Sequence, residues 1–308
     1  NELNIGIPVT GVGSFRLSAF RQRGSISAVL RYVPGEIPAL NSLALPPILA
    51  DMIMEKRGLL LVVGSTGSGK STTIAAMLDH RNTIATGHIL TLEDPIEFLF
   101  RNKKSIVNQR EIGSDASDLP IALKNALRQA PDCILIGEIR DKETMAAALA
   151  YAQSGHLVVA TLHANNSYQA LTRIINFYPI ENRQSLLADL SSTLRAIVSQ
   201  RLIGAIDGRR RAAVEVLLNT RHIAELIEQG EIALIKEAIE KSLSPGSQTF
   251  EQALMQLIKD GIVTQDEALA HADSASNLFW LLNNSAQTVQ EEAPEQEEAS
   301  FTEFTLKM

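Results

Sequence analysis

Gly58-Leu-Leu-Leu-Val-Val-Gly-Ser-Thr-Gly-Ser-Gly-Lys-Ser71 is the stretch of sequence that decides the fold. Its first half, residues 58–63, is a short apolar run, which predicts a buried β-strand. Its second half, residues 64–71, has the pattern G-x-x-x-x-G-K-S and precedes a predicted helix over 70–80. A strand, a glycine-rich loop and a helix in this order form a P-loop, so the sequence predicts a phosphate-binding site.

Each kind of residue in this loop has a physical task. Glycines let backbone N–H groups turn inward around phosphate oxygens, and the helix that follows directs its positive end at the anion. Lys70 supplies a positive charge to the outer phosphates, and the Ser71 hydroxyl is a ligand for Mg²⁺. The residues that we expect to bind ATP with its Mg²⁺ are Ser65, Thr66, Gly67, Ser68, Gly69, Lys70, Ser71 and Thr72.

Strands and helices alternate on both sides of the loop. The expected strands are 58–63, 88–92, 133–137 and 157–162, and the expected helices are 70–80, 117–129, 141–153, 167–177 and 182–199. Short, continuously apolar strands between amphipathic helices are typical of a parallel sheet that is covered on both faces. The sequence therefore predicts an α/β fold.

The flanking segments differ from this alternating core. Residues 9–33 alternate like strands of an earlier sheet, and because the chain opens at Asn1 rather than Met we expect a fragment. After the core, Asp207-Gly208 predicts a hairpin turn and a return strand over 211–218. Small helices are expected over 220–242 and 248–273. The predicted divisions are an N-terminal domain remnant (1–33), a linker rich in Pro and Gly (34–40), the main domain (41–283) and an acidic disordered tail (284–308).

Composition narrows the class of protein. The chain has 308 residues, of which 45% are hydrophobic, so wholesale disorder is excluded. No apolar run approaches the roughly 18 residues that span a bilayer. The single cysteine, Cys133, excludes a disulfide framework and a multi-cysteine zinc site, and we expect it to be a buried thiol of a cytosolic protein. Six of the 35 acids and one of the 28 bases lie from Ser285 onward, so the rest is nearly neutral.

Acidic residues follow two of the predicted strands directly: Glu93, Asp94 and Glu97 come after one, and Glu138 after another. Because ligands bind at the carboxyl ends of parallel strands, these acids are candidates for holding Mg²⁺ and for orienting a water molecule. Glu138 is long enough to act through a magnesium-bound water. His163 ends a further apolar strand and is suited to hydrogen-bond a terminal phosphate. Helix caps, surface salt bridges or a structural histidine are the alternatives for these positions.

Taken together, these motifs resemble the secretion-ATPase superfamily, and within it the PilT/PilU retraction motors of type IV pili. The resemblance is carried by Gly64–Ser71, Thr91-Leu-Glu-Asp-Pro-Ile-Glu97, Ile136-Gly-Glu-Ile-Arg-Asp141 and Gly155–His163. Three further segments are most similar to the PilU branch: Asn125–Asp132, Thr161–Asn166 and Arg173–Pro179. The likeness extends from about Gly11 to Asn284.

The resemblance implies roles for individual residues. Glu97 is implied to be the catalytic base that polarises water, Glu138 to support Mg²⁺, and His163 to sense the γ-phosphate. Arg16 and Arg31, in the N-terminal segment, are implied to lie near the phosphates, where a cation stabilises the charge of the transferring group. A solvated sheet face is the alternative for each of these arginines.

The resemblance also implies an architecture and a setting. It implies a RecA-like P-loop core with a partial PAS-like N-terminal domain and a small C-terminal helical region, assembled as a homo-hexamer. The implied reaction, ATP and water to ADP and phosphate, drives pilus retraction in twitching motility. The implied partners are a PilT-like retraction ATPase, to which this chain is accessory, and a PilC-like platform protein. The implied place is the cytoplasm, peripheral to the inner membrane at the pilus base.

Other functions remain alternatives at this point. A pilus-assembly or type II secretion ATPase often carries a four-cysteine zinc insert, which one cysteine does not allow. A conjugation-type secretion ATPase fits the sequence after Gly155 less well. A regulatory ring subunit with weak hydrolysis would not need Lys70, Glu97 and Glu138 together. A nucleic-acid motor is disfavoured because the chain has no excess of basic over acidic residues and has only 5% aromatic residues.

Overall fold

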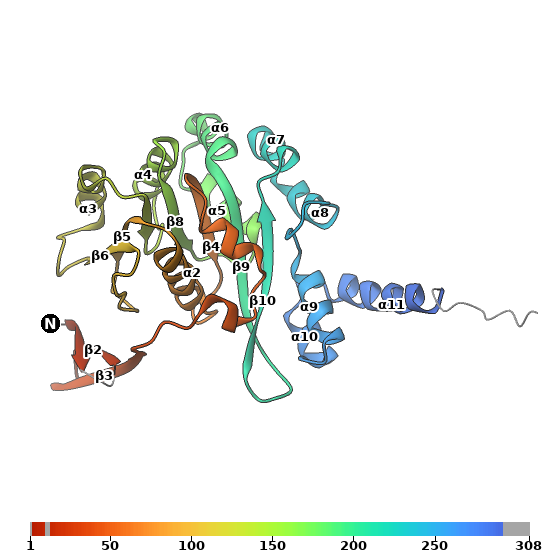
Figure 1. Cartoon of the computed structure of the whole chain (residues 1–308), viewed down its shortest axis with the longest axis horizontal. Helices are drawn as coiled ribbons and strands as arrows, with labels where there is room; N and C mark the ends of the chain where they lie inside the picture. The colour runs from red at the N-terminus through yellow and green to blue at the C-terminus, as the bar shows by residue number, and fades with distance from the viewer. Residues whose placement is uncertain (1, 10–12, 292–308) are drawn as a thin grey trace, which may run out of the picture.

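A seven-stranded sheet organises most of the computed structural model, which describes residues 2–9 and 13–291 (Figure 1). Its strands, in spatial order, are β10 (Arg210–Leu218), β9 (Leu194–Gly204), β4 (Gly58–Val63), β8 (Leu157–Leu162), β7 (Cys133–Ile136), β5 (Gly87–Glu93) and β6 (Ser105–Glu111). Neighbouring strands from β9 to β6 are parallel, and β10 pairs with β9 as an antiparallel hairpin. The predicted α/β fold is confirmed.

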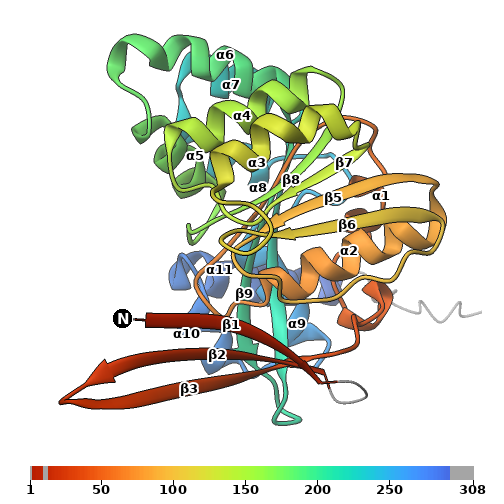
Figure 2. The ribbon, with the colours of Figure 1, turned by 90° about the vertical axis from the view of Figure 1, so that its left-hand side faces the viewer.

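Helices cover both faces of this sheet (Figure 2). One face carries α1 (Ile48–Met52) and α2 (Lys70–Ile84), and the other carries α3 (Leu119–Ala126), α4 (Lys142–Gln153), α5 (Ser167–Asn176) and α6 (Arg183–Thr193). Strand β4 shows why, because its side chains alternate between two hydrophobic clusters, one on each face of the sheet. Leu60 packs with Met77 of α2 in one cluster, and Leu61 packs with Met145 of α4 in the other. A strand that is buried on both sides must be apolar at every position.

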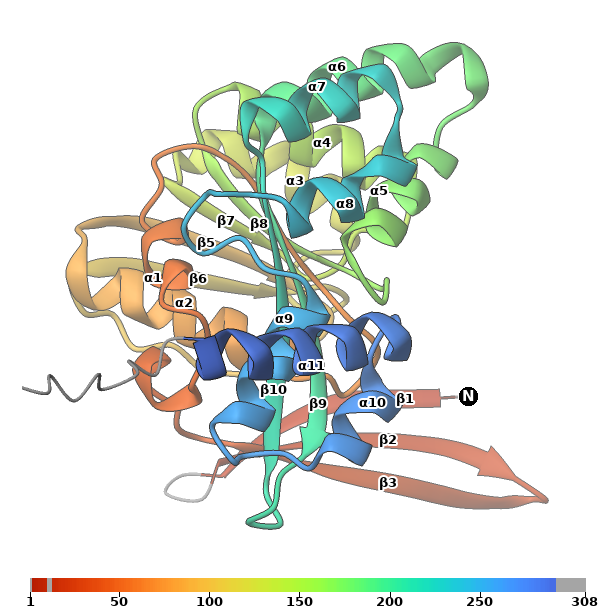
Figure 3. The ribbon, with the colours of Figure 1, turned by 90° about the vertical axis from the view of Figure 1, so that its right-hand side faces the viewer.

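The hairpin and the C-terminal helices extend this core. The helices are α7 (Arg221–Gln229), α8 (Ile235–Glu240), α9 (Phe250–Lys259), α10 (Gln265–His271) and α11 (Ala275–Glu291). Helices α9, α10 and α11 pack around Phe250 and Leu278 and against Ile203 of β9 (Figure 3). Helix α11 continues to Glu291, so it extends into the predicted tail; positions 292–308 lie outside the described residues.

The predicted helix over 182–199 is wrong in its second half. Helix α6 ends at Thr193, and β9 begins at the next residue. Ala196, Ile197 and Val198 pair with β4, so β9 extends the parallel sheet on that side. This tertiary pairing overrides the helical pattern. Sequence analysis also did not predict β6, which lies at the edge of the sheet and ends in four polar residues, Asn108–Glu111.

A separate three-stranded sheet precedes the core. It consists of β1 (Glu2–Val9), β2 (Gly13–Gln22) and β3 (Ser25–Pro34), all antiparallel (Figure 2). Residues 35–39 contain no helix or strand, and short 3₁₀ helices follow at Leu40–Leu43, Leu127–Gln129, Ile180–Asn182 and Ile232–Leu234. The domain boundaries drawn from the sequence stay a prediction.

Two expectations from composition concern the core and the bilayer. Cys133 is fully buried in β7, and burial raises the pKa of its thiol to about 12. This confirms a structural thiol, because a buried apolar site disfavours the charged thiolate. Within the described ranges, no helix has both the length and the apolar character that a bilayer span requires.

Candidate active site

The carboxyl ends of four neighbouring strands place the predicted functional segments side by side. Gly64 follows β4, His163 follows β8, Glu138 comes two residues after β7, and Glu93 ends β5. These strands are adjacent in the sheet in the order β4-β8-β7-β5 and are parallel, so their ends meet at one edge. This is the edge at which ligands bind in open α/β sheets.

Lys70 lies at the centre of this edge, in the first turn of α2. Its Nζ donates to the carbonyl oxygens of Gly64 and Ser65, at 2.8 Å each. Burial lowers the pKa of Lys70, and the charges of Glu138 and Glu97 oppose this effect. The ammonium group is therefore held inside the loop by neutral acceptors. An anion can displace these acceptors, because a hydrogen bond between two oppositely charged groups is stronger than one to a neutral carbonyl oxygen.

The loop around Lys70 leaves polar groups without partners. Ser65, Thr66 and Gly67 form its exposed arch. The Ser68 hydroxyl oxygen is buried and has no hydrogen-bond partner among the described residues. Such an orphaned group costs free energy unless a ligand satisfies it, so the loop fits a phosphate.

The start of α2 has the same character. Gly69 precedes the helix with φ = 90°, and a Cβ there would lie 2.7 Å from Gln200 Nε2, so only glycine fits. Ser71 and Thr72 are half-buried in the first turn, and neither hydroxyl forms a hydrogen bond within the part of the chain that the structure describes. The Ser71 hydroxyl is therefore free to bind a cation, which fits the predicted Mg²⁺ ligand.

The acids after β5 have different environments. Glu93 accepts hydrogen bonds from Thr91 Oγ1 at 2.6 Å and from Gln109 Nε2 at 3.2 Å, and also from the backbone N–H of Glu97. Burial raises the pKa of Glu93. Glu97 is half-buried, contributes to the field at Lys70, and has no such set of side-chain partners among the described residues. Glu93 therefore holds the segment that follows β5 in place, and Glu97 is the acid that remains available for chemistry.

Glu138 lies between two basic side chains. Its Oε2 accepts a hydrogen bond from Arg140 Nε at 2.7 Å, and its Oε1 lies 3.4 Å from His163 Nε2. Arg140 also lies 4.0 Å from Asp94, across the gap between the ends of β7 and β5. Hydrogen bonding to Glu138 raises the pKa of Arg140. The structure thus brings Lys70, Glu97, Glu138 and His163 to one edge, as the sequence predicted.

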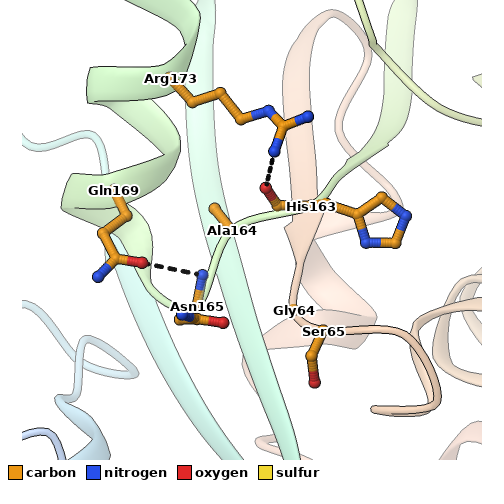
Figure 4. A pocket seen from close by; sticks show the side chains of 7 residues that line it. All are labelled: Gly64, Ser65, His163, Ala164, Asn165, Gln169 and Arg173. Atoms are coloured by element: carbon orange, nitrogen blue, oxygen red, sulfur yellow. Dashed lines mark hydrogen bonds between the residues drawn. The ribbon is translucent and has the colours of Figure 1, made fainter.

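A cavity of about 330 Å³ opens beside the loop (Figure 4). Its lining residues are Gly64, Ser65, His163, Ala164, Asn165, Gln169 and Arg173. Arg173 donates from Nη1 to the His163 carbonyl oxygen at 2.9 Å, and the Asn165 backbone N–H donates to Gln169 Oε1 at 3.3 Å. The volume lies at the lower end of the range of small-molecule binding pockets, and α5 holds its wall in place.

The N-terminal arginines belong to strands outside the seven-stranded sheet. Arg16 and Arg31 are paired in register on β2 and β3 of the separate sheet. The Arg31 side chain is exposed and forms no hydrogen bond or ion pair with another residue of the described ranges. A role for either arginine at the phosphates stays a prediction.

Comparison of the sequence with models of protein families identifies the family of this chain. The model for type II/IV secretion system proteins matches residues 14–212, which include every motif segment of the sheet edge. The chain belongs to the type II/IV secretion system protein family. This confirms the family expected from the motifs, and the core is therefore a RecA-like ATPase fold.

Three relatives refine the placement within this family. The type IV pilus ATPase PilU of Pseudomonas aeruginosa is 51% identical, with 92% of this chain and 74% of that protein covered. The type IV pilus retraction ATPase PilT of the same organism is 40% identical, with 90% and 80% covered. The crystal structure of the retraction motor PilT with bound ADP has a TM-score of 0.84 at 41% identity, with 90% and 79% covered. The chain resembles PilU more than PilT in sequence, as predicted.

The structure of this family member adds residues that sequence analysis did not assign. Gln200 donates from Nε2 to the Ser68 carbonyl oxygen at 2.9 Å and accepts from Thr73 Oγ1 at 2.8 Å. The sequence gives no signal for Gln200, because the pattern up to residue 199 predicts a helix. Arg140 and Arg173 lie within the motif segments, but the sequence assigns them no role. Their proximity to predicted acids and to His163 is visible only once the strands are aligned.

Proposed function

We propose that this chain hydrolyses ATP to ADP and phosphate and that the reaction powers type IV pilus retraction in twitching motility. One observation carries the proposal: Lys70, Glu97, Glu138 and His163 converge on the phosphate loop at one edge of the sheet. The similarity to PilU and PilT supports the biological setting.

The residues of this edge divide the work of phosphoryl transfer. The backbone N–H groups of 65–70 and the Lys70 ammonium bind the phosphate oxygens and neutralise charge that develops on them. Glu97 orients the attacking water and accepts its proton. His163 hydrogen-bonds the γ-phosphate. Mg²⁺ would neutralise charge on the phosphates, and Ser71 would hold it directly and Glu138 through a water molecule.

Assembly and location extend the proposal. Six copies form a ring that acts with a PilT-like ATPase on a PilC-like platform protein, at the cytoplasmic side of the inner membrane. Segment 34–40 is the hinge between the N-terminal sheet and the core. In the ring, Arg16 and Arg31 are brought toward the phosphates when the N-terminal sheet moves.

Phosphate release by the purified full chain tests the reaction. Native protein should release phosphate from ATP, and Lys70→Ala should abolish release, because the outer phosphates lose their only buried cation in the loop. Lys56→Ala is a matched control, since Lys56 is exposed just before β4 at the opposite end of that strand. Equal release by native protein and Lys70→Ala would contradict hydrolysis at this site, and absence of release by the native protein would favour a regulatory ring subunit.

Pilus retraction in cells tests the biological role. Cells that lack this protein should retract pili more weakly, and the Lys70→Ala variant should not restore the native force. Deleting the main retraction ATPase in the same strains separates an accessory motor from an independent one. Normal retraction under load without this chain would contradict the proposed role and leave the ATPase activity standing.

A further inference from the structure

The loop that carries His163 is tied at its far end to the C-terminal helices. It leaves β8 at Leu162 and enters α5 at Ser167. Arg173 holds its first carbonyl group, at His163. Its other end, Asn165 and Asn166, is held by residues outside the motif segments.

Strand β9 delivers the first of these residues. Ser199 is in register with Val63, the last residue of β4, so Gln200 and Arg201 continue beyond the sheet edge beside the phosphate loop. Because side chains alternate along a strand, the two residues point to opposite sides. Gln200 binds Ser68 of the phosphate loop, and Arg201 Nη2 donates to the Asn165 carbonyl oxygen at 3.2 Å. One strand therefore contacts both loops of the site.

Asp273, in the turn between α10 and α11, supplies the second contact. Its Oδ1 forms an ion pair with Arg201 Nη2, and its Oδ2 accepts a hydrogen bond from Asn166 Nδ2 at 3.0 Å. Asn166 in turn caps α5, because its Oδ1 accepts from the Gln169 backbone N–H at 3.0 Å. A single carboxylate thus links the C-terminal helices to the start of α5.

The pair is built into the structure rather than lying loosely on the surface. Arg201 and Asp273 are 19% and 15% exposed. The Arg201 guanidinium stacks on the Phe250 ring at 3.9 Å and donates from Nη1 to the His271 carbonyl oxygen at 2.6 Å. Exposed ion pairs contribute little, whereas a largely buried pair whose arginine makes three hydrogen bonds fixes geometry.

We propose that Arg201 and Asp273 are positioning residues for His163, so that helices α9–α11 belong to the hydrolytic apparatus. The inference rests on the proposed function, in which His163 binds the γ-phosphate. Only Ala164 separates His163 from the segment that the pair holds, and small displacements of a reacting group are costly. It follows that a partner that moves the α10–α11 turn alters turnover without touching the nucleotide.

A double-mutant cycle with His163 tests this inference on the full chain. Asp273→Ala should lower kcat about tenfold, because the ion pair with Arg201 and the hydrogen bond from Asn166 are both lost, while KM and ADP affinity change less than twofold. In a His163→Ala background the same substitution should lower kcat by less than about twofold, because the residue through which it acts is gone. Asp273→Asn, which keeps an acceptor for Arg201, should give an intermediate loss and serves if Asp273→Ala does not fold.

Asp260, which follows α9, offers a matched control. Its Oδ1 accepts a hydrogen bond from Gln256 Nε2 at 2.7 Å, so it is an aspartate of the C-terminal helical region that is bonded within its own helix end. Asp260→Ala should leave kcat within about twofold of native. Equal losses from Asp273→Ala in both backgrounds, or a loss confined to KM, would overturn the inference. Phosphate release that does not depend on Lys70 would instead overturn the proposed function.

Discussion

Arg140 donates a 2.7 Å hydrogen bond to Glu138 and is the exposed partner of the pair, at 63% against 17%. The second oxygen of Glu138 faces His163. The carboxylate that we propose to support Mg²⁺ is therefore oriented by a cation at the surface of the site. A group that holds a ligand in this way acts on catalysis indirectly, as the outer partners of metal ligands do.

Removing this cation should slow hydrolysis. Arg140→Ala is expected to lower kcat for phosphate release about tenfold, the effect of one hydrogen bond between charged groups. ADP affinity should change little, because Arg140 is not part of the phosphate loop. Steady-state kinetics with ADP titration separates the two quantities. Arg128→Ala is the control, since Arg128 is exposed and lies after α3; a native kcat in Arg140→Ala would show that Glu138 needs no such support.

The two acids after β5 should respond differently to neutralisation. Glu97→Gln is expected to keep ATP binding and to lower turnover about a hundredfold or more, because a general base is lost. Glu93→Gln retains an acceptor for Thr91 and for the loop, so its turnover should fall less than about tenfold. Single-turnover phosphate release together with ATP binding measures both. A larger loss in Glu93→Gln than in Glu97→Gln would reverse the assignment of the two roles.

Ser71 should control the requirement for Mg²⁺. Its hydroxyl has no partner in the described chain, so Ser71→Ala should leave the free energy of unfolding near the native value. The Mg²⁺ concentration for half-maximal phosphate release should rise about tenfold, since one cation ligand is lost. Thr83→Ala, near the other end of α2, is the control; its hydroxyl bonds the Asp79 carbonyl oxygen. An unchanged Mg²⁺ dependence would remove Ser71 from the metal site.

The sequence predicted the parts of the site that depend on local pattern. Leu59–Val63 is apolar at every position, and the loop that follows has one known geometry, so β4 and the position of Lys70 needed no long-range information. Strand β9 and Gln200 did need it. Gln200 meets Thr73 across 127 positions of sequence, and its strand forms only because β4 offers an edge to pair with. Contacts that arise from strand order are invisible to periodicity.

Glu215 lies behind the His163 loop, and we expect its titration to make the free energy of unfolding depend on pH. It is 2% exposed and accepts hydrogen bonds from the Ser167 backbone N–H at 2.7 Å and from Ser199 Oγ at 2.9 Å. Burial raises the pKa of Glu215 above its ordinary value of 4.5. Between 4.5 and the raised pKa, the folded state binds more protons than the unfolded state, so the free energy of unfolding falls as pH rises.

Glu215→Gln isolates this contribution, because glutamine keeps an acceptor for Ser167 and Ser199 but does not titrate. The free energy of unfolding of the native chain minus that of the variant should therefore decrease as pH rises from 4.5, and then level off above the folded-state pKa. Urea unfolding at a series of pH values measures it. Glu225→Gln, at an exposed pair with Arg221, should give a nearly flat difference in the same range. A difference for Glu215→Gln that grows with pH would mean that the hydrogen bonds from Ser167 and Ser199 outweigh burial and hold this carboxylate charged.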